Sequence, residues 1–238
     1  GVEDDYDAGV KWHHDGGAWE FHLAYFLNEE LNDATNLNRY SVDLVRSGEE
    51  QNEEVHQGNL RVGYTLGKGT ENSSQFGVSG QYGGIDNLST ERTGDRWHAA
   101  LHYSGRYGPW NPELQVTRYE FRPENPDGVD NRLVLMGNLT STRHVAAEGT
   151  LLNANLRRFW DVDWGPFKGF NAYYNYSHLY KDEAEFRDSQ LHNPGCVFQA
   201  GPFWVWVDFL VGKNAWYLND SPEASGMGPG GTDEWEYR

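Results

Sequence analysis

Histidines and carboxylates at short spacings are the residues of this chain that could carry chemistry. His13 and His14 are adjacent, and neighbouring residues of a strand point to opposite faces, so they cannot share a metal ion without distortion. His98 and His102 share a face but lie about 13 Å apart along a strand, which is too far for one ion. The histidine pairs therefore predict no metal site.

Glu20 and His22 are same-face neighbours on a strand and could act as an acid–base pair. A hydrogen-bonded pair lining a water-filled lumen explains the same spacing without catalysis, and we favour it. The motifs G-x-S-x-G, H-E-x-x-H and the P-loop are absent from the sequence. The segment DGVDN (residues 127–131) lacks the distal Glu and the spacing of a calcium loop. We therefore predict no enzyme, no cofactor and no resident metal.

The segment FNAYYNYSHLY (residues 170–180) alternates in period 2 between an aromatic face and a polar, uncharged face. Phe170 and Tyr174 share the first face, and Asn171 and Asn175 share the second. Its length exceeds the usual strand of about five or six residues and matches the about nine to eleven tilted residues that cross a bilayer core. In a closed barrel the polar face would meet water and the aromatic face would meet lipid.

The same alternation recurs along the whole chain, joined by short turns and longer acidic loops. Turn signals occur at residues 15–17 and at Gly201-Pro202. The apolar pattern of the seventh segment shifts near Arg118, which predicts a bulge or a strand end there. The predicted strands are residues 6–14, 19–27, 39–46, 59–66, 75–83, 96–104, 113–121, 132–137, 147–159, 170–180, 190–200, 203–213 and 235–238.

The composition of the 238 residues excludes several classes of protein. A formal net charge of -17 argues against a nucleic-acid partner, because phosphate contacts need clustered Lys and Arg. Acidic runs such as Glu49-Glu50 are typical of solvated loops, with loop-borne divalent-cation sites as the alternative. The single Cys196 excludes an internal disulfide. The first residues are not a signal peptide, so we expect either a processed chain or one that starts within a longer protein.

These patterns predict an all-β protein, a single domain over residues 1–238 that forms an antiparallel transmembrane barrel. About twelve strands would lie in this chain, as part of a barrel of roughly sixteen. The outward faces are almost free of charge, and aromatic residues recur near strand ends, as interfacial girdles do (Trp12, Trp19, Tyr64, Trp97, Tyr103 and Tyr180). The residues expected to line the pore are Lys11, Glu20, His22, Arg61, Gln81, His98, His102, Asn171, Asn175 and Asp208.

Two runs of the sequence resemble a known family. They are EDDYDAGVKWHHD (residues 3–15), continued by WEFHL (19–23), and YYNYSHLYKDE (173–183), followed by GPF (201–203) and VD (207–208). Both are similar to Gram-negative outer-membrane porins of the phosphate-selective-porin-like superfamily. The resemblance implies a homotrimeric, water-filled channel for small hydrophilic solutes or ions in the bacterial outer membrane. Family members are longer at both ends, which implies a fragment. Phosphate selectivity does not carry over, because the chain has no ladder of Lys and Arg.

Two other classes of protein fit the same strand pattern. A secreted carbohydrate-binding or carbohydrate-hydrolysing β-sandwich would use aromatic faces to stack sugars, with Glu20 and Glu120 as the first candidate carboxylates. A structural barrel that surrounds a partner protein would show the same alternation as a pore. The solvent exposure of five side chains distinguishes the sandwich from the porin. A second sheet would bury Trp19, Phe21, Leu23, Val205 and Phe209 in a sandwich, and these side chains would be exposed on the outer face of a porin.

Overall fold

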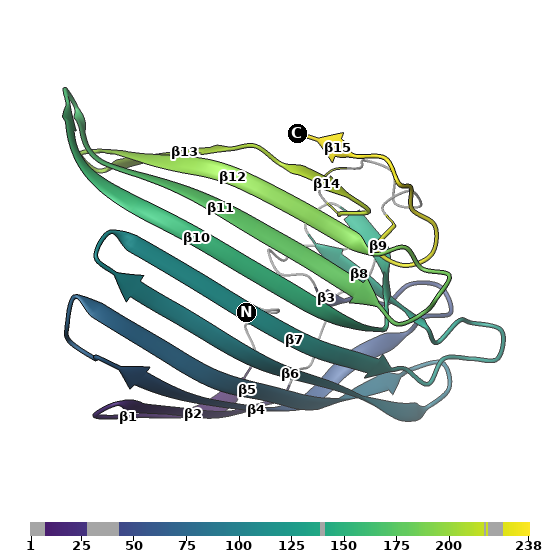
Figure 1. Ribbon diagram of the computed structural model, residues 1–238. Coiled ribbons are helices and arrows are strands. Elements are labelled where there is room, and N and C mark those ends of the chain that lie inside the picture. The colour runs from purple at the N-terminus through teal and green to yellow at the C-terminus, as the bar shows by residue number, and fades with distance from the viewer. Residues whose placement is uncertain (1–7, 28–42, 139–140, 217, 219–225) are drawn as a thin grey trace.

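A computed structural model describes residues 8–27, 43–138, 141–216, 218 and 226–238 of the chain. Within these ranges the chain is all-β, and twelve of its strands form one antiparallel sheet (Figure 1). The predicted strand number of about twelve is confirmed. The strands of this large sheet are β1 (Gly9–Gly16), β2 (Trp19–Phe26), β4 (Asn52–Leu66), β5 (Asn72–Asn87), β6 (Arg92–Tyr107), β7 (Trp110–Arg122), β10 (Glu148–Trp164), β11 (Phe167–Lys181), β12 (Ser189–Ala200), β13 (Phe203–Asp208), β14 (Val211–Lys213) and β15 (Glu236–Tyr237).

The strands follow one another in a meander. The order across the sheet is β1-β2-β4-β5-β6-β7-β10-β11-β12-β14-β15, and β13 pairs with β12. The strand predicted at residues 170–180 is the centre of β11, which pairs on both sides with β10 and β12. Because successive residues point to opposite faces, each strand gives one set of side chains to the convex, outer face of the sheet and the other set to the concave, inner face.

The two rims of the large sheet differ in their connections. At one rim four connections are two-residue turns, namely residues 17–18, 108–109, 165–166 and 201–202. Gly108, Gly165 and Gly201 take φ between +55° and +61° at the first turn position, which suits the type II′ turn of tight hairpins. At the other rim the connections reach the length of residues 123–147, which contain two further strands. The predicted alternation of short and long connections holds except around β5, where residues 88–91 on the long-connection rim are fewer than residues 67–71 on the short-turn rim.

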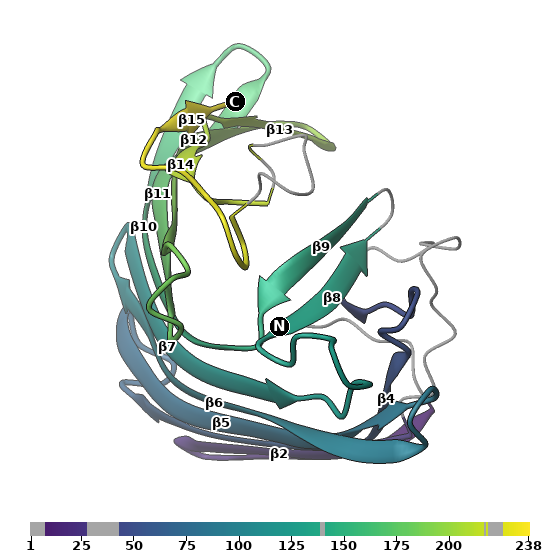
Figure 2. The same cartoon turned by 90° about the vertical axis from the view of Figure 1, so that its right-hand side faces the viewer.

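The sheet bends around a hollow and, within the described residues, does not close. Figure 2 shows it end-on as an open arc. β1 forms one border of the sheet, and β13 and β15 lie at the other. The described residues thus show a curved, antiparallel, twelve-stranded sheet, and the predicted barrel closure is not seen in them.

A second sheet lies inside the hollow at the rim of long connections (Figure 2). It consists of β3 (Asp43–Leu44), β8 (Leu133–Asn138) and β9 (Ser141–Ala146) in the order β3-β8-β9. Its Leu44, Val134 and Val145 pack against Ile85 and Phe121 of the large sheet. This cluster is the hydrophobic core of the described residues, and it fixes the small sheet to one end of the inner face.

The bulge or strand end predicted near Arg118 is wrong, because β7 continues to Arg122. The pairing of β7 with β6 and with β10 runs through Arg118 without a register shift. The apolar pattern changes there because Tyr119 and Phe121 point inward, where the small sheet covers them. The large sheet has its irregularities elsewhere, at His56, whose φ is +50°, and between Asp161 and Trp164.

The remaining predicted strands are only partly described. Of residues 39–46, residues 43–44 form β3 of the small sheet, and residues 39–42 lie outside the described ranges. The strand predicted at residues 203–213 is interrupted after Asp208 and resumes as β14. The start of the first predicted strand, residues 6–7, also lies outside the described ranges.

Candidate functional site

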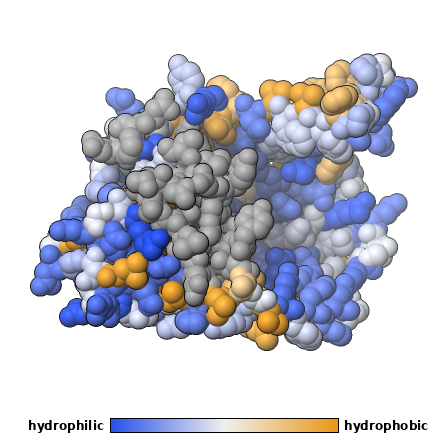
Figure 3. Space-filling model, turned by 180° about the vertical axis from the view of Figure 1, so that it is seen from behind, coloured by the Kyte–Doolittle hydropathy of each residue, from blue (hydrophilic) through white to orange (hydrophobic). Residues whose placement is uncertain are grey.

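The inner face of the large sheet carries polar side chains around two open cavities. Figure 3, seen from the side opposite to Figure 1, shows mainly hydrophilic surface around the hollow where described residues are visible. The larger cavity has a volume of about 970 Å³ and the smaller of about 420 Å³. Seven of the ten residues predicted to line a pore surround the larger cavity: Lys11, Glu20, His22, Arg61, Gln81, His98 and His102.

Arg61 and His102 border both cavities, so they lie at the point where the two meet. Arg61 of β4 stands directly opposite His22 of β2. The His102 ring lies over Gly77 of the neighbouring strand, where a Cβ atom would come within 2.1 Å of its Nε2. A glycine at position 77 therefore leaves the space that the imidazole occupies.

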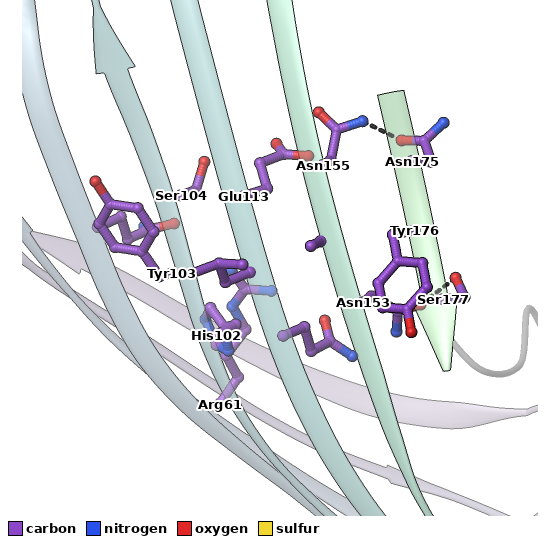
Figure 4. Close-up of a pocket in the computed structure, with 14 residues that line it drawn as sticks. Arg61, His102, Tyr103, Ser104, Glu113, Asn153, Asn155, Asn175, Tyr176 and Ser177 are labelled. Atoms are coloured by element: carbon purple, nitrogen blue, oxygen red, sulfur yellow. Dashed lines mark hydrogen bonds between the residues drawn. The ribbon is translucent and has the colours of Figure 1, made fainter. Parts of the chain in front are cut away.

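The smaller cavity is lined mainly by amides and hydroxyls (Figure 4). Asn155 donates a hydrogen bond to Asn175, and Ser177 donates one to Asn153 over 2.7 Å. Glu113 contributes the one carboxylate of this lining. Such a surface offers many hydrogen bonds and little charge, which suits water and small polar solutes.

Of the three other residues predicted to line the pore, one lines the smaller cavity, one lies on a border strand and one is buried. Asn175 lines the smaller cavity. Asp208 is exposed on the border strand β13 and accepts a 2.5 Å hydrogen bond from the Tyr173 hydroxyl. Asn171 shares the inner face but is buried, and so is His98, although His98 borders the larger cavity. His98 packs edge-on against Phe121 with ring centroids 5.3 Å apart, so it lies close to the small sheet.

The outer face carries an apolar band. One row of directly paired residues crosses six strands without a charge: Phe21, Val62, Val78, Leu101, Val116 and Leu152. Leu101, at its centre, is 64 % exposed. We define the apolar band by the exposed side chains Trp19, Leu23, Tyr25, Leu60, Phe76, Val78, Tyr82, Leu101, Leu114, Val116, Leu156 and Tyr174.

Aromatic side chains pair toward the short-turn side of the apolar band. Trp19 contacts Tyr64 with ring centroids 4.8 Å apart, and Phe76 contacts Tyr103 at 5.1 Å. On the side of the long connections, Trp97 and Tyr82 are paired across β5 and β6. The aromatic residues predicted near strand ends thus border the apolar band on two sides.

Charged residues on the outer face begin where the apolar band ends. Arg118 of β7 forms ion pairs with Glu148 at the start of β10 and with Asp182 beyond the end of β11. Hydrogen bonds from the Arg118 guanidinium lower the pKa of the Asp182 carboxyl. Glu120 accepts hydrogen bonds from Trp97 and Arg122 nearby. All of these charges lie at the rim of long connections.

The five side chains whose exposure distinguishes a sandwich from a porin are not buried. Trp19, Leu23, Val205 and Phe209 are each about half exposed, between 47 % and 54 %, and Phe21 is partly exposed. Among the described residues no second sheet covers this face, because the small sheet packs on the inner face.

The sequence did not predict that His13 pairs with His22, a residue of the predicted pore lining. His13 of β1 stands directly opposite His22 of β2, with the two rings stacked at a centroid distance of 4.3 Å. The two-residue turn at residues 17–18 fixes this register, since it pairs Gly16 with Trp19 and each earlier residue with its counterpart. The hairpin signal in the sequence could therefore have revealed the pair.

Comparisons with protein-family models, with curated proteins and with solved structures found no match. Among the described residues, no helix is long and apolar enough to span a bilayer.

Proposed function

We propose that this protein is a porin of the bacterial outer membrane that forms a water-filled channel for passive diffusion of small hydrophilic solutes or ions. The observation that carries the proposal is the division of the large sheet into an exposed apolar outer face and a polar inner face. Soluble monomers rarely expose continuous apolar patches larger than a few hundred Å². In a bilayer, lipid hydrocarbon would cover this apolar face.

The dimensions of the apolar band fit a bilayer. The side chains of Trp97 and Tyr107 both belong to the outer face of β6, and the two residues are ten positions apart. That separation is about 33 Å along a strand, or about 25 Å across the membrane at a strand tilt of about 40°. Transmembrane barrels have an apolar band of about this height between two aromatic girdles. Their connections are short on the periplasmic side and long on the outside, as the two rims of this sheet are.

A channel requires that the free edges of β1 and of the strands at the opposite border be paired. Unpaired backbone N–H and C=O groups in lipid cost several kcal/mol each, so we propose that these edges pair and complete a larger barrel of roughly sixteen strands. A homotrimer is the assembly that the resemblance to porins implies, and it is part of the proposal.

Cations and neutral solutes are the proposed cargo. The chain has a net charge of -17, and acidic connections at the rim of long loops raise the local concentration of cations. The inner face combines a few charges of both signs with amides and hydroxyls. That lining lacks the row of basic side chains that would select phosphate.

The first test is electrophoretic mobility of the detergent-purified protein before and after boiling. A closed, detergent-resistant barrel migrates faster before boiling than after it, and that shift is the expected result. A protein that is soluble and monomeric without detergent, with no shift on boiling, would overturn the proposal. The carbohydrate-binding β-sandwich would then be the next hypothesis, to be tested by glycan binding.

A further inference from the structure

We propose that His13, Glu20 and His22 form a binding site for a divalent transition-metal ion at the β1–β2 hairpin, on the inner face of the sheet. The possible ligand atoms of these three side chains all lie within 4.8 Å of one another. Among the described residues this is the one group of three or more His, Cys, Asp or Glu side chains that meets this spacing. The inference does not rest on the proposed channel, because it depends on one hairpin alone.

The register of the hairpin brings the two imidazoles together. The N–H of Leu27 donates to the carbonyl of Ala8, which marks residues 8 and 27 as a hydrogen-bonded pair. Hydrogen-bonded and non-hydrogen-bonded pairs alternate along an antiparallel ladder, so His13 and His22, five steps further on, form a non-hydrogen-bonded pair. Side chains approach most closely at such pairs, and the His13 and His22 rings are stacked.

Glu20 supplies the carboxylate from the same strand and face as His22. It is hydrogen-bonded to the His22 Nε2 atom, and its second oxygen accepts a 3.2 Å hydrogen bond from the Gln75 side-chain amide. This outer contact orients the carboxylate in the way that groups around metal ligands do. Ligand atoms bound tetrahedrally at about 2.1 Å from one ion lie about 3.4 Å apart, so side-chain rotations that bring these atoms about 1–1.5 Å closer together form the site.

The donor set selects the class of metal. Two imidazole nitrogens and one carboxylate are the ligands of many zinc sites and of other first-row transition metals. Calcium and magnesium prefer all-oxygen sites, and the positive charge of Arg61 opposite His22 further disfavours ions held by charge alone. His13 is exposed on the border strand, so water or a solute can fill the remaining coordination positions.

His14 provides a matched control. It is adjacent to His13 on the same strand but points to the outer face, where its ring stacks on Trp12. Substitutions at positions 13 and 14 therefore remove the same functional group from neighbouring places, one inside the proposed site and one outside it.

The test is calorimetric titration of untagged, detergent-purified protein with Ni²⁺, with Ca²⁺ as the comparison ion. We expect one Ni²⁺ per chain at this site, no comparable Ca²⁺ binding, and at least about tenfold weaker Ni²⁺ binding in His13→Gln, Glu20→Gln and His22→Gln. His14→Gln should retain the wild-type affinity, and circular dichroism should show unchanged strand content in all variants. Absence of Ni²⁺ binding, or equal affinity in the His13→Gln, His22→Gln and wild-type proteins, would overturn the inference. His13 is exposed on a border strand, so its variant keeps the test informative even if another variant fails to fold.

Discussion

Arg118 and Asp182 form a two-pronged ion pair across the intervening strand β10, with Nη1–Oδ1 and Nη2–Oδ2 distances of 2.5 and 2.7 Å. Glu148 of β10 completes the group through its own contact with Arg118. Two strand positions before Arg118, on the same face, Val116 belongs to the apolar band. The ion pair therefore marks the level at which the outer face changes from apolar to charged, as expected at the boundary between lipid hydrocarbon and water.

A charged side chain within the apolar band is predicted to destabilise the protein in lipid. Leu101→Arg places a guanidinium at the centre of the band, and we expect it to lower the free energy of unfolding in lipid vesicles by about 2–4 kcal/mol. Gln115→Arg adds the same side chain on the inner face, where water is available, and should have a small effect. Urea titrations of both variants in vesicles measure the difference. Equal stability of the two variants would argue against lipid contact.

The buried ion pair of Glu54 and Arg96 is predicted to be costly to break. Both side chains are fully buried, with 2.7 Å between Arg96 Nη1 and Glu54 Oε1. Arg96→Met leaves the carboxylate buried without this partner, and we expect a loss of about 3–5 kcal/mol of stability in denaturant unfolding. The double variant Arg96→Met with Glu54→Leu removes both charges and should recover most of that loss. If the double variant is as unstable as the single one, packing and not charge accounts for the effect.

Arg61 is predicted to control ion selectivity, because it borders both cavities of the inner face. Arg61→Gln removes a positive charge from the path, so reversal potentials in a salt gradient should shift toward stronger cation selectivity. Arg158→Gln is the control, because the Arg158 guanidinium lies over the outer-face rings of Trp110 and Trp160. An identical shift in both variants would show that overall charge, and not the position of Arg61, sets the selectivity.

Attachment of the small sheet is predicted to depend on pH through His144. The His144 Nε2 atom of β9 lies 2.7 Å from Glu50 Oε1, and this hydrogen bond raises the pKa of His144. A pKa that is higher in the folded than in the unfolded state gives stability that is complete below about pH 6.5 and is lost as pH rises through the folded pKa.

Limited proteolysis at residues 126–131, just before β8, checks this pH dependence. Cleavage should be slower at pH 5.5 than at pH 8 in the wild type, after correction for the protease's own pH profile. His144→Gln cannot gain the charge, so its cleavage should depend little on pH. A pH difference of the same size in His144→Gln would remove His144 as the cause.

The sequence predicted the large sheet well because its strands are long and strongly alternating. The predicted strands at residues 170–180 and 19–27 show this best, since neither face changes its environment along most of each strand. The inward-facing Tyr119 and Phe121 broke the apolar pattern of their strand, because a segment distant in the sequence covers them. Residues 43–44, 133–138 and 141–146 are too short and weakly patterned to reveal that they pair with one another.

The candidate metal ligands could also be predicted only in part from the sequence. Glu20 and His22 are related by period 2 and are visible within one strand. His13 joins them only through pairing across the hairpin, and a register error of one residue would turn it to the opposite face. Local periodicity therefore finds the face of each strand, but contacts between strands need the register as well.

The proposed channel is tested most directly by the electrical conductance of planar lipid bilayers after addition of the detergent-purified protein. A cation-preferring channel is expected to give discrete conductance steps and a reversal potential in a potassium chloride gradient that indicates cation preference. Bilayers that stay silent at protein concentrations at which vesicle flotation shows insertion would contradict a channel. A protein that does not float with vesicles would contradict membrane insertion itself.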